Sequence, residues 1–243
     1  MKTSIEIKEL SKHYETKQAV NNVSFTIADG ELIALLGMNG AGKTTLINML
    51  SCVTSPTGGD ALLLGKSIVA EPDQVKKLIA VSPQETAVAP NLTVRENLEL
   101  LAGLYGFDKR TIKQKTDRMI KQFSLKPYEK QRSKTLSGGW KRKLSIAMAL
   151  ISDPKVLFLD EPTLGLDVLA RRELWAVIEK LKETTTIILT THYLEEAESL
   201  SDRICIMKDG QIKASGTVTQ LKEQAGMTTF EDAFVKLVKD GDQ

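Results

Sequence analysis

Eight residues, Gly37 to Thr44, follow the spacing G-x-x-x-x-G-K-[ST], which is the pattern of a phosphate-binding loop. Its glycines allow backbone N–H groups to curl around a phosphate chain, Lys43 adds a positive charge, and the Thr44 hydroxyl can reach Mg²⁺. The apolar run 32–36 precedes the loop as a buried strand would, and residues 45–50 follow it with helical spacing. This context favours a nucleotide site over an ordinary glycine turn.

Two acids follow another apolar run of strand length. Val156–Leu159 delivers Asp160 and Glu161 at its carboxyl end, where open parallel sheets place their active sites. There Asp160 can hold Mg²⁺ through water, and Glu161 can act as a general base toward an attacking water. His192 follows the predicted strand 185–189 at the same edge, which favours a γ-phosphate contact over a structural role. The alternative for the two acids is the start of a loop.

A second glycine-containing turn, Ser137-Gly138-Gly139, leads into a predicted helix over 141–151. Ser137 can cap this helix and donate to a phosphate oxygen, and the two glycines permit close approach of a ligand to the backbone. Such a cap is common by itself, so its significance depends on the acids that follow it.

Tyr14 stands ahead of the phosphate-binding loop among polar neighbours, so its ring is predicted to be exposed. The ring could stack on a nucleotide base, or it could merely cover the edge of a strand. The local sequence leaves both interpretations open, and the neighbouring His13 is interpreted as a solvated side chain.

The chain has 243 residues, 42% of them hydrophobic, which suffices for one large α/β domain or two small ones. With 33 Lys and Arg against 31 Asp and Glu, the net charge is only +2, and the absence of a dense basic tract argues against a dedicated nucleic-acid binder. Cys52 and Cys205 lie far apart in apolar settings, so we interpret both as core residues in a reducing compartment. Without a signal region or a run of 18 apolar residues, the chain is expected to be soluble.

Strand patterns dominate the first third of the chain. Alternating apolar residues at Ile5 and Ile7, and again over 23–27, predict two half-buried strands that open the fold as an antiparallel β layer. Further short strands are predicted at 61–64 and 78–81, after which the sheet continues to Gln84.

Helical spacing prevails from about residue 88 to 152. Either Asn91 or Thr93 can cap a helix over 95–105, and 109–123 gives a second amphipathic stretch. Lys and Arg recur there with acids between them, which favours a solvated face over a binding patch. Farther on, the patterns predict a helix over 167–182, a hairpin around Lys208-Asp209-Gly210, and small helices in 218–243.

The motifs at 37–44, Gln84, 136–139, 156–161 and His192, in this order and spacing, resemble the ATP-binding subunit of ABC transporters over residues 3–220. The resemblance implies an α/β fold, a P-loop NTPase of ABC type with a mainly parallel core sheet, an N-terminal antiparallel β layer and a helical subdomain. A single ATPase domain would then occupy 1–243. Its nucleotide-binding core would be about 1–87 and 153–220, its helical signature subdomain about 88–152, and its C-terminal helical tail 221–243.

The resemblance also implies roles for individual residues, with ATP and Mg²⁺ as ligands. Glu161 would be the general base, with His192 and Gln84 completing the catalytic group, while Mg²⁺ would be held by Thr44, Gln84 and Asp160. Ser137–Gly139 would bind the nucleotide held by a second copy, head to tail, so one chain alone would have no complete site. Tyr14 would stack on adenine. The residues expected to contact nucleotide are Tyr14, Gly37, Asn39, Gly40, Gly42, Lys43, Thr44, Thr45, Ser137, Gly138, Gly139 and Asp167.

Two positions depart from the commonest pattern of the family. Trp140 stands where many members have Gln, and Gly165 stands where many have Ser or Ala before Leu-Asp. Neither change removes a phosphate donor, although Trp140 leaves the detailed contact of the signature helix open.

Within the family, the runs 91–106, 163–167 and 191–197 look like those of bacterial exporters of the drug and antibiotic-resistance type. The resemblance then implies an ATPase at the cytoplasmic face of the membrane that powers a separate integral membrane permease, with a drug-like, peptide or lipid-like cargo and no nucleic-acid partner. Its docking groove is expected at 84–92, with apolar flanks at 87–90 and 98–104. The alternatives to an exporter are an importer subunit and a soluble ribosome-associated ATPase. A nucleotide-gated module without hydrolysis is disfavoured by the presence of Glu161 and His192.

Overall fold

The structure, a computed structural model, describes residues 2–239. Its central element is a six-stranded sheet in the order β10-β9-β3-β8-β7-β6, in which every neighbouring pair is parallel except β9 with β10. The strands are β3 (Leu32–Leu36), β6 (Ile79–Ser82), β7 (Val156–Asp160), β8 (Thr186–Thr191), β9 (Arg203–Lys208) and β10 (Gln211–Gly216). The predicted mainly parallel core sheet and the hairpin that ends it are confirmed.

A second, antiparallel sheet forms the N-terminal β layer in the order β2-β1-β4-β5. Its strands are β1 (Thr3–Tyr14), β2 (Lys17–Ala28), β4 (Gly58–Leu63) and β5 (Lys66–Ser67). The strand predicted at 61–64 therefore belongs to this layer, since β4 pairs with β1. The strand predicted at 78–81 is β6 of the core sheet, and the short helix α2 (Pro72–Lys76), which the sequence did not indicate, connects the two sheets.

Both faces of the core sheet are buried, which explains why its strands are continuous apolar runs. In β3, Ile33 and Leu35 pack toward the antiparallel layer and α1 (Lys43–Leu50), whereas Leu32, Ala34 and Leu36 pack on the opposite side. The strand period of two divides the other central strands between the same two cores. The sheet is thus held rigidly from both sides, and its carboxyl edge is a fixed platform.

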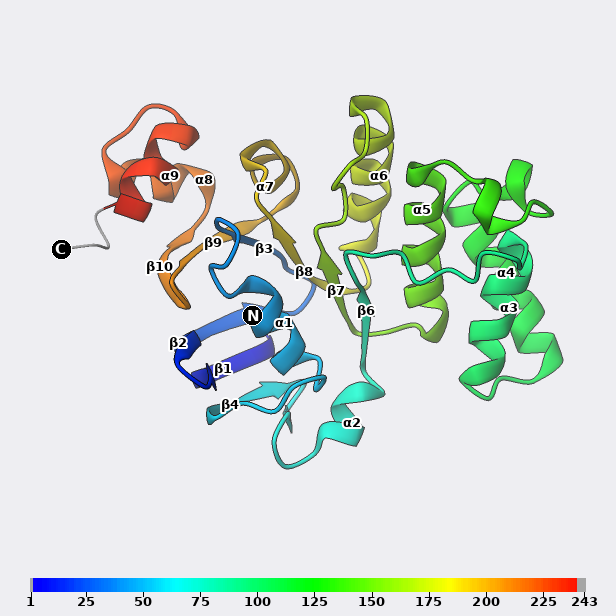
Figure 1. The fold of residues 1–243 in the computed structure, drawn as a ribbon, viewed down its shortest axis with the longest axis horizontal. Coiled ribbons are helices and arrows are strands. Elements are labelled where there is room, and N and C mark those ends of the chain that lie inside the picture. The colour runs from blue at the N-terminus through cyan, green and yellow to red at the C-terminus, as the bar shows by residue number, and fades with distance from the viewer. Residues whose placement is uncertain (1, 240–243) are drawn as a thin grey trace.

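Helices cover the face of the core sheet that is opposite the antiparallel layer, and they extend beyond the sheet (Figure 1). The helical subdomain at one end of the molecule contains α3 (Val94–Leu104), α4 (Lys109–Gln122) and α5 (Gly138–Ala149), with single 3₁₀ turns at Lys126–Tyr128, Ser133–Thr135 and Leu150–Ser152. The helices α6 (Val168–Leu181) and α7 (Leu194–Leu200) flank β8 in the chain. At the opposite end lie α8 (Val218–Ala225) and α9 (Phe230–Lys239); positions 240–243 of the predicted tail lie outside the described residues.

Local hydrogen bonds fix the helical subdomain. Thr93, rather than Asn91, caps α3: its hydroxyl accepts from the Glu96 N–H at 3.1 Å, and the Glu96 carboxylate accepts from the Thr93 N–H at 2.7 Å. This reciprocal pair is a capping box. Asn97, fully buried one turn later, donates to the Ser133 hydroxyl at 2.8 Å and thereby ties α3 to the segment that leads into α5.

Over residues 2–239, no helix combines the length and the apolar character needed to cross a bilayer.

Candidate nucleotide-binding site

The phosphate-binding loop connects β3 to α1 and requires glycine for steric reasons. Gly42 has a left-handed φ of 103°, and a Cβ there would lie 2.3 Å from the Ala19 carbonyl oxygen. A Cβ on Gly37 would lie 2.3 Å from the Met207 carbonyl oxygen. No side chain caps the start of α1, and its first turn contains no acid. The N–H groups of that turn are therefore available to an anion.

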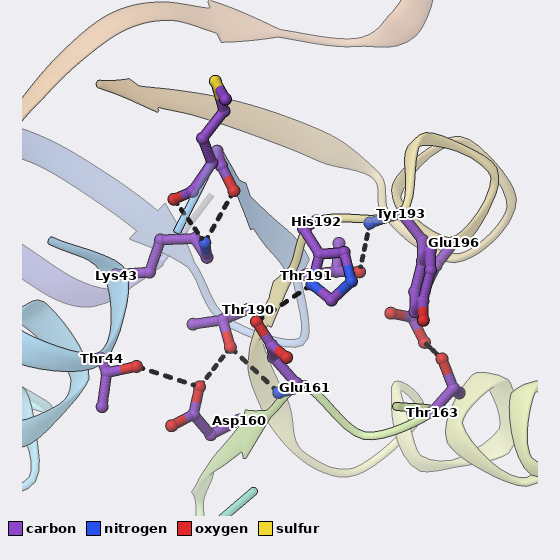
Figure 2. Close-up of polar contacts among 12 residues, drawn as sticks. Lys43, Thr44, Asp160, Glu161, Thr163, Thr190, Thr191, His192, Tyr193 and Glu196 are labelled. Carbon is purple, nitrogen blue, oxygen red and sulfur yellow. Dashed lines mark hydrogen bonds and ion pairs between the residues drawn. The ribbon is translucent and has the colours of Figure 1, made fainter. Parts of the chain in front are cut away.

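Lys43 lies folded back over this loop (Figure 2). Its ammonium donates to the carbonyl oxygens of Gly37, at 2.7 Å, and Met38, at 3.1 Å, and the side chain is buried. Burial lowers the pKa of Lys43, while the negative charges of Glu161 and Asp160 act in the opposite direction. The lysine is thus held at the loop by carbonyl groups and faces the two acids across the site.

Asp160, the last residue of β7, is oriented by a threonine of the next strand (Figure 2). The Thr190 hydroxyl donates to Asp160 Oδ1 at 2.5 Å and accepts from the Glu161 N–H at 3.0 Å. The Thr44 hydroxyl lies 3.5 Å from the same carboxylate oxygen, which is a weak contact. Sequence reasoning missed Thr190. A correct alignment of β7 with β8 would have identified it, because Thr190 of β8 pairs with Asp160 of β7.

Glu161 and His192 face one another at the carboxyl edge of the sheet. Glu161 Oε1 lies 3.1 Å from His192 Nδ1, where a ring N–H donates to the carboxylate. The backbone of Glu161 has a φ of 45°, which is unusual for a residue other than glycine. Two contacts hold it there, since the Glu161 N–H donates to both the carbonyl and the hydroxyl of Thr190. The turn directs the carboxylate away from the strand and toward the histidine.

A cleft of about 610 Å³ brings together most of the residues expected at the nucleotide. It lies between the phosphate-binding loop, the end of β1 and the carboxyl ends of β7 and β8. Its lining includes Tyr14, Lys17, Asn39, Gly40, Gly42, Lys43, Thr44, Thr45, Gln84, Glu161, Leu164 and His192. The Tyr14 ring is 45% exposed, with the Lys12 ammonium 5.0 Å from its centroid. The ring is therefore accessible to a base at the open end of the cleft.

The expected second group of nucleotide contacts does not line this cleft. Ser137 is the exposed N-cap residue of α5, but its hydroxyl makes no capping hydrogen bond, so the expected side-chain cap is wrong. A Cβ added to Gly138 would meet nothing within 4 Å, so the backbone there is open to an approaching molecule. Asp167 caps α6 by accepting from the N–H groups of Leu169 and Ala170 at 3.0 and 2.9 Å.

Trp140 is directed into the helical subdomain. Its ring centroid lies 4.4 Å from that of Tyr128, and the Lys143 ammonium lies 4.2 Å from the Trp140 ring centroid. The indole is partly buried against the main core. The unusual residue therefore leaves Ser137 and Gly138 exposed, whereas Gly139 is partly buried, and a Cβ added there would lie 3.2 Å from the Ala170 side chain of α6. Gly165, the other departure from the common pattern, has a φ of 73° and open space around it.

The oxygen atoms near Thr44 fit Mg²⁺. The Thr44 hydroxyl, the Asp160 carboxylate and the carbonyl oxygen of the Gln84 side chain, which lines the same cleft, are hard oxygen donors, which this ion prefers. Among the described residues, no group of three His, Cys, Asp or Glu side chains could hold a metal by itself. A cation at this position would therefore need additional ligands, which phosphate oxygens and water can supply.

The expected docking groove needs one correction. Leu98 is fully buried in the core and offers no surface. Leu100 and Leu104, in the same expected flank, are exposed because they lie four residues apart on the outer face of α3, and Tyr105, which follows the helix, is exposed as well. Val88 is partly buried against the same core.

A family model described as ABC transporter matches residues 20–164 of the chain. The doxorubicin resistance ATP-binding protein DrrA of Mycobacterium tuberculosis is 43% identical over 214 residues, covering 88% of this chain and 65% of the relative. The chain thus spans a little under two thirds of that relative's length.

Solved structures agree with this match. A solved ATP-binding subunit of an ABC transporter superimposes with a TM-score of 0.85 at 30% identity, covering 97% of this chain and 99% of that one. The ATP-binding cassette MJ0796, solved as a dimer in a post-hydrolysis state bound to ADP and Pi, superimposes with a TM-score of 0.78 at 26% identity, covering 88% and 98%. With the phosphate-binding loop, the paired acids and the separate Ser-Gly-Gly turn in place, these matches show that the chain belongs to the ABC transporter family as an ATP-binding cassette.

Proposed function

We propose that this chain binds ATP with Mg²⁺, hydrolyses it to ADP and phosphate, and thereby powers a separate membrane protein. The observation that supports this most is the meeting of Lys43, Thr44, Glu161 and His192 in one cleft at the carboxyl edge of a parallel sheet, with the buried Asp160 carboxylate 3.5 Å from the Thr44 hydroxyl. The core, about 1–87 and 153–220, would hold the nucleotide, and the helical subdomain, about 88–152, would present the Ser-Gly-Gly turn to a second copy.

Binding would use fixed groups of the loop. The free N–H groups at the start of α1 and the Lys43 ammonium would contact the phosphates, so the lysine would exchange its carbonyl partners for phosphate oxygens. Thr44, Asp160 and Gln84 would hold Mg²⁺, which neutralises phosphate charge when bound. The Tyr14 ring would stack on the base at the open end of the cleft.

Hydrolysis would depend on the pair at the cleft edge. Glu161 would accept a proton from the attacking water as a general base, because its carboxylate projects from β7 into the cleft. The Nδ1–H of His192 would orient that carboxylate through the 3.1 Å contact, and a contact of the other ring nitrogen with a γ-phosphate oxygen would require that nitrogen to carry a proton as well. Thr190 would keep both acids in place.

A head-to-tail dimer would complete the site. Ser137, Gly138 and Gly139 lie at the start of α5 and outside the cleft, and Ser137 and Gly138 are exposed, so this turn would contact a nucleotide bound by another copy. The relative MJ0796 forms a dimer, which supports the same arrangement here. Exposed Leu164, Val168 and Leu169 around Asp167 would lie in that interface.

Export is the direction we propose, at the cytoplasmic face of the membrane, because the relative DrrA is named for doxorubicin resistance. The membrane partner would dock on 84–92 and on α3, whose second half exposes the apolar side chains of Leu100, Leu104 and the following Tyr105. An importer permease or a ribosome recovered with the native chain would contradict export.

The test is ATP-dependent dimerisation of a Glu161→Gln variant, which should retain binding but lack the base. We expect a dimer by light scattering in Mg²⁺-ATP and a monomer in ADP. Adding Lys43→Ala should abolish the dimer, whereas Glu183→Gln, which changes an exposed acid that does not line the cleft, should hydrolyse ATP as the wild type does. A Glu161→Gln chain that binds ATP and stays monomeric would refute the arrangement, and so would wild-type hydrolysis by Lys43→Ala.

A further inference from the structure

Arg142, on the second turn of α5, is a buried cation surrounded by backbone carbonyl groups. Its side chain is only 4% exposed. Nε donates to the Pro162 carbonyl at 2.9 Å, Nη2 donates to the Asp160 carbonyl at 2.8 Å, and Nη1 donates to the carbonyl of Pro83. A longer contact of 3.4 Å joins Nη1 to the Gln84 carbonyl. Within residues 2–239, no carboxylate forms an ion pair with this guanidinium.

These carbonyls lie at or just beyond the ends of β6 and β7, where the two strands stop pairing and their chains diverge. The strands β6 and β7 are paired up to Ser82 with Leu159, and beyond that pair one chain turns into the Gln84 loop and the other into the Asp160–Pro162 turn. The guanidinium spans the gap between them. One turn further along α5, the Ser145 hydroxyl lies 3.3 Å from that of Ser82, and both are buried. The helix is therefore fastened to the ends of both strands.

Burying this charge is costly. Burial lowers the pKa of Arg142 to about 10, although the negative charges of Asp160 and Glu196 oppose the shift, so the group remains a cation near pH 7. An apolar side chain of similar length could fill the same space without the cost of removing a charge from water. A planar guanidinium, however, can donate to several carbonyls in fixed directions, which neither an apolar chain nor the single nitrogen of a lysine can do.

We propose that Arg142 is a positioning residue that holds the Gln84 loop at a fixed place relative to Asp160 and Glu161. The same helix begins at Ser137–Gly139, the turn expected to contact the second copy's nucleotide. Arg142 thereby couples engagement of that nucleotide to the placement of Gln84 beside the first. This inference rests on the proposed ATPase function.

The experiment compares Arg142→Lys with the matched control Lys143→Met. Lys143 is the next residue on the helix, is similarly buried at 6%, and pairs with Glu173 of α6 instead of the strand ends. Both substitutions should lower the melting temperature. Arg142→Lys should also reduce kcat by about tenfold or more while changing ATP affinity, measured without Mg²⁺, by less than about twofold. The Mg²⁺ concentration for half-maximal turnover should rise.

Hydrogen exchange supplies a readout that does not depend on turnover. The Glu161 N–H, which donates to Thr190, and the amides of the β6–β7 pairing over 79–82 should exchange faster in Arg142→Lys than in the wild type, and at the wild-type rate in Lys143→Met. If Arg142→Lys fails to fold, Arg142→Gln, which keeps two amide donors and removes the buried charge, replaces it.

The proposal would be overturned if Arg142→Lys kept the wild-type kcat and the wild-type hydrogen-exchange rates. It would also be overturned if Arg142→Lys and Lys143→Met lost kcat equally, in proportion to their lowered melting temperatures. A wild-type chain that fails to hydrolyse ATP would refute the proposed function instead. The exchange comparison would still decide whether Arg142 holds the loop.

Discussion

Replacing Thr190 with valine should slow hydrolysis as well as lower the stability of the fold. The two side chains have similar shape, so the main loss is the hydroxyl and its two hydrogen bonds, one donated to the Asp160 carboxylate and one accepted from the Glu161 N–H. A bond to an ionised group contributes about 1.5–3 kcal/mol and a neutral bond about 1 kcal/mol. The Glu161 N–H keeps the Thr190 carbonyl as an acceptor at 3.2 Å, so the second loss lies at the low end.

The expected cost is therefore about 2–3 kcal/mol in total, and if half or more of it is expressed in the transition state, kcat falls by about fivefold or more. Thr191→Val provides the control. Thr191 is the next residue of β8, is equally buried, and its hydroxyl accepts from the Tyr193 N–H at 3.0 Å without touching either acid. Steady-state phosphate release and urea unfolding should be measured for both. Equal kcat in two equally stable variants would refute the role of Thr190.

Three further outcomes are expected. Tyr14→Ala should weaken ATP binding by about 1–3 kcal/mol if the ring stacks on adenine, and unchanged affinity in a fluorescence titration would make it a surface tyrosine. Leu104→Asp should reduce co-purification with membranes without altering ATPase activity, because the side chain is 75% exposed, and wild-type recovery would move the docking surface elsewhere. The pKa of Glu129 lies below its ordinary 4.5, because Lys126 and then Arg95 donate to its carboxylate. The ionised carboxylate therefore stabilises the fold above pH 4.5, and this contribution is lost as the pH falls through the lower pKa of the folded state. Glu129→Gln should therefore be less stable than the wild type near neutrality and lose less stability on acidification, and parallel melting curves across pH would contradict this.

The sequence alone predicted the features that depend on residues close together along the chain. The loop at 37–44 was predictable because its glycines, lysine and threonine act together within one strand–loop–helix unit. The continuous apolar runs identified the central strands, since strands buried on both faces need apolar residues at every position. The start of α6 at Asp167 was likewise predictable, because a cap is a contact between residues a few positions apart.

Contacts between distant residues were decided only by the tertiary structure. The pairing of β7 with β8 places Thr190 beside Asp160, and the packing of α5 on β6 and β7 brings Arg142 to Pro83 and Pro162; no local pattern contains either fact. The same limit explains the assignment of 61–64 to the antiparallel layer, because strand partners are chosen by burial and register across the whole chain. Residue types at short spacing therefore determined which chemistry this chain carries, whereas long-range packing determined which side chains hold the reacting groups in place.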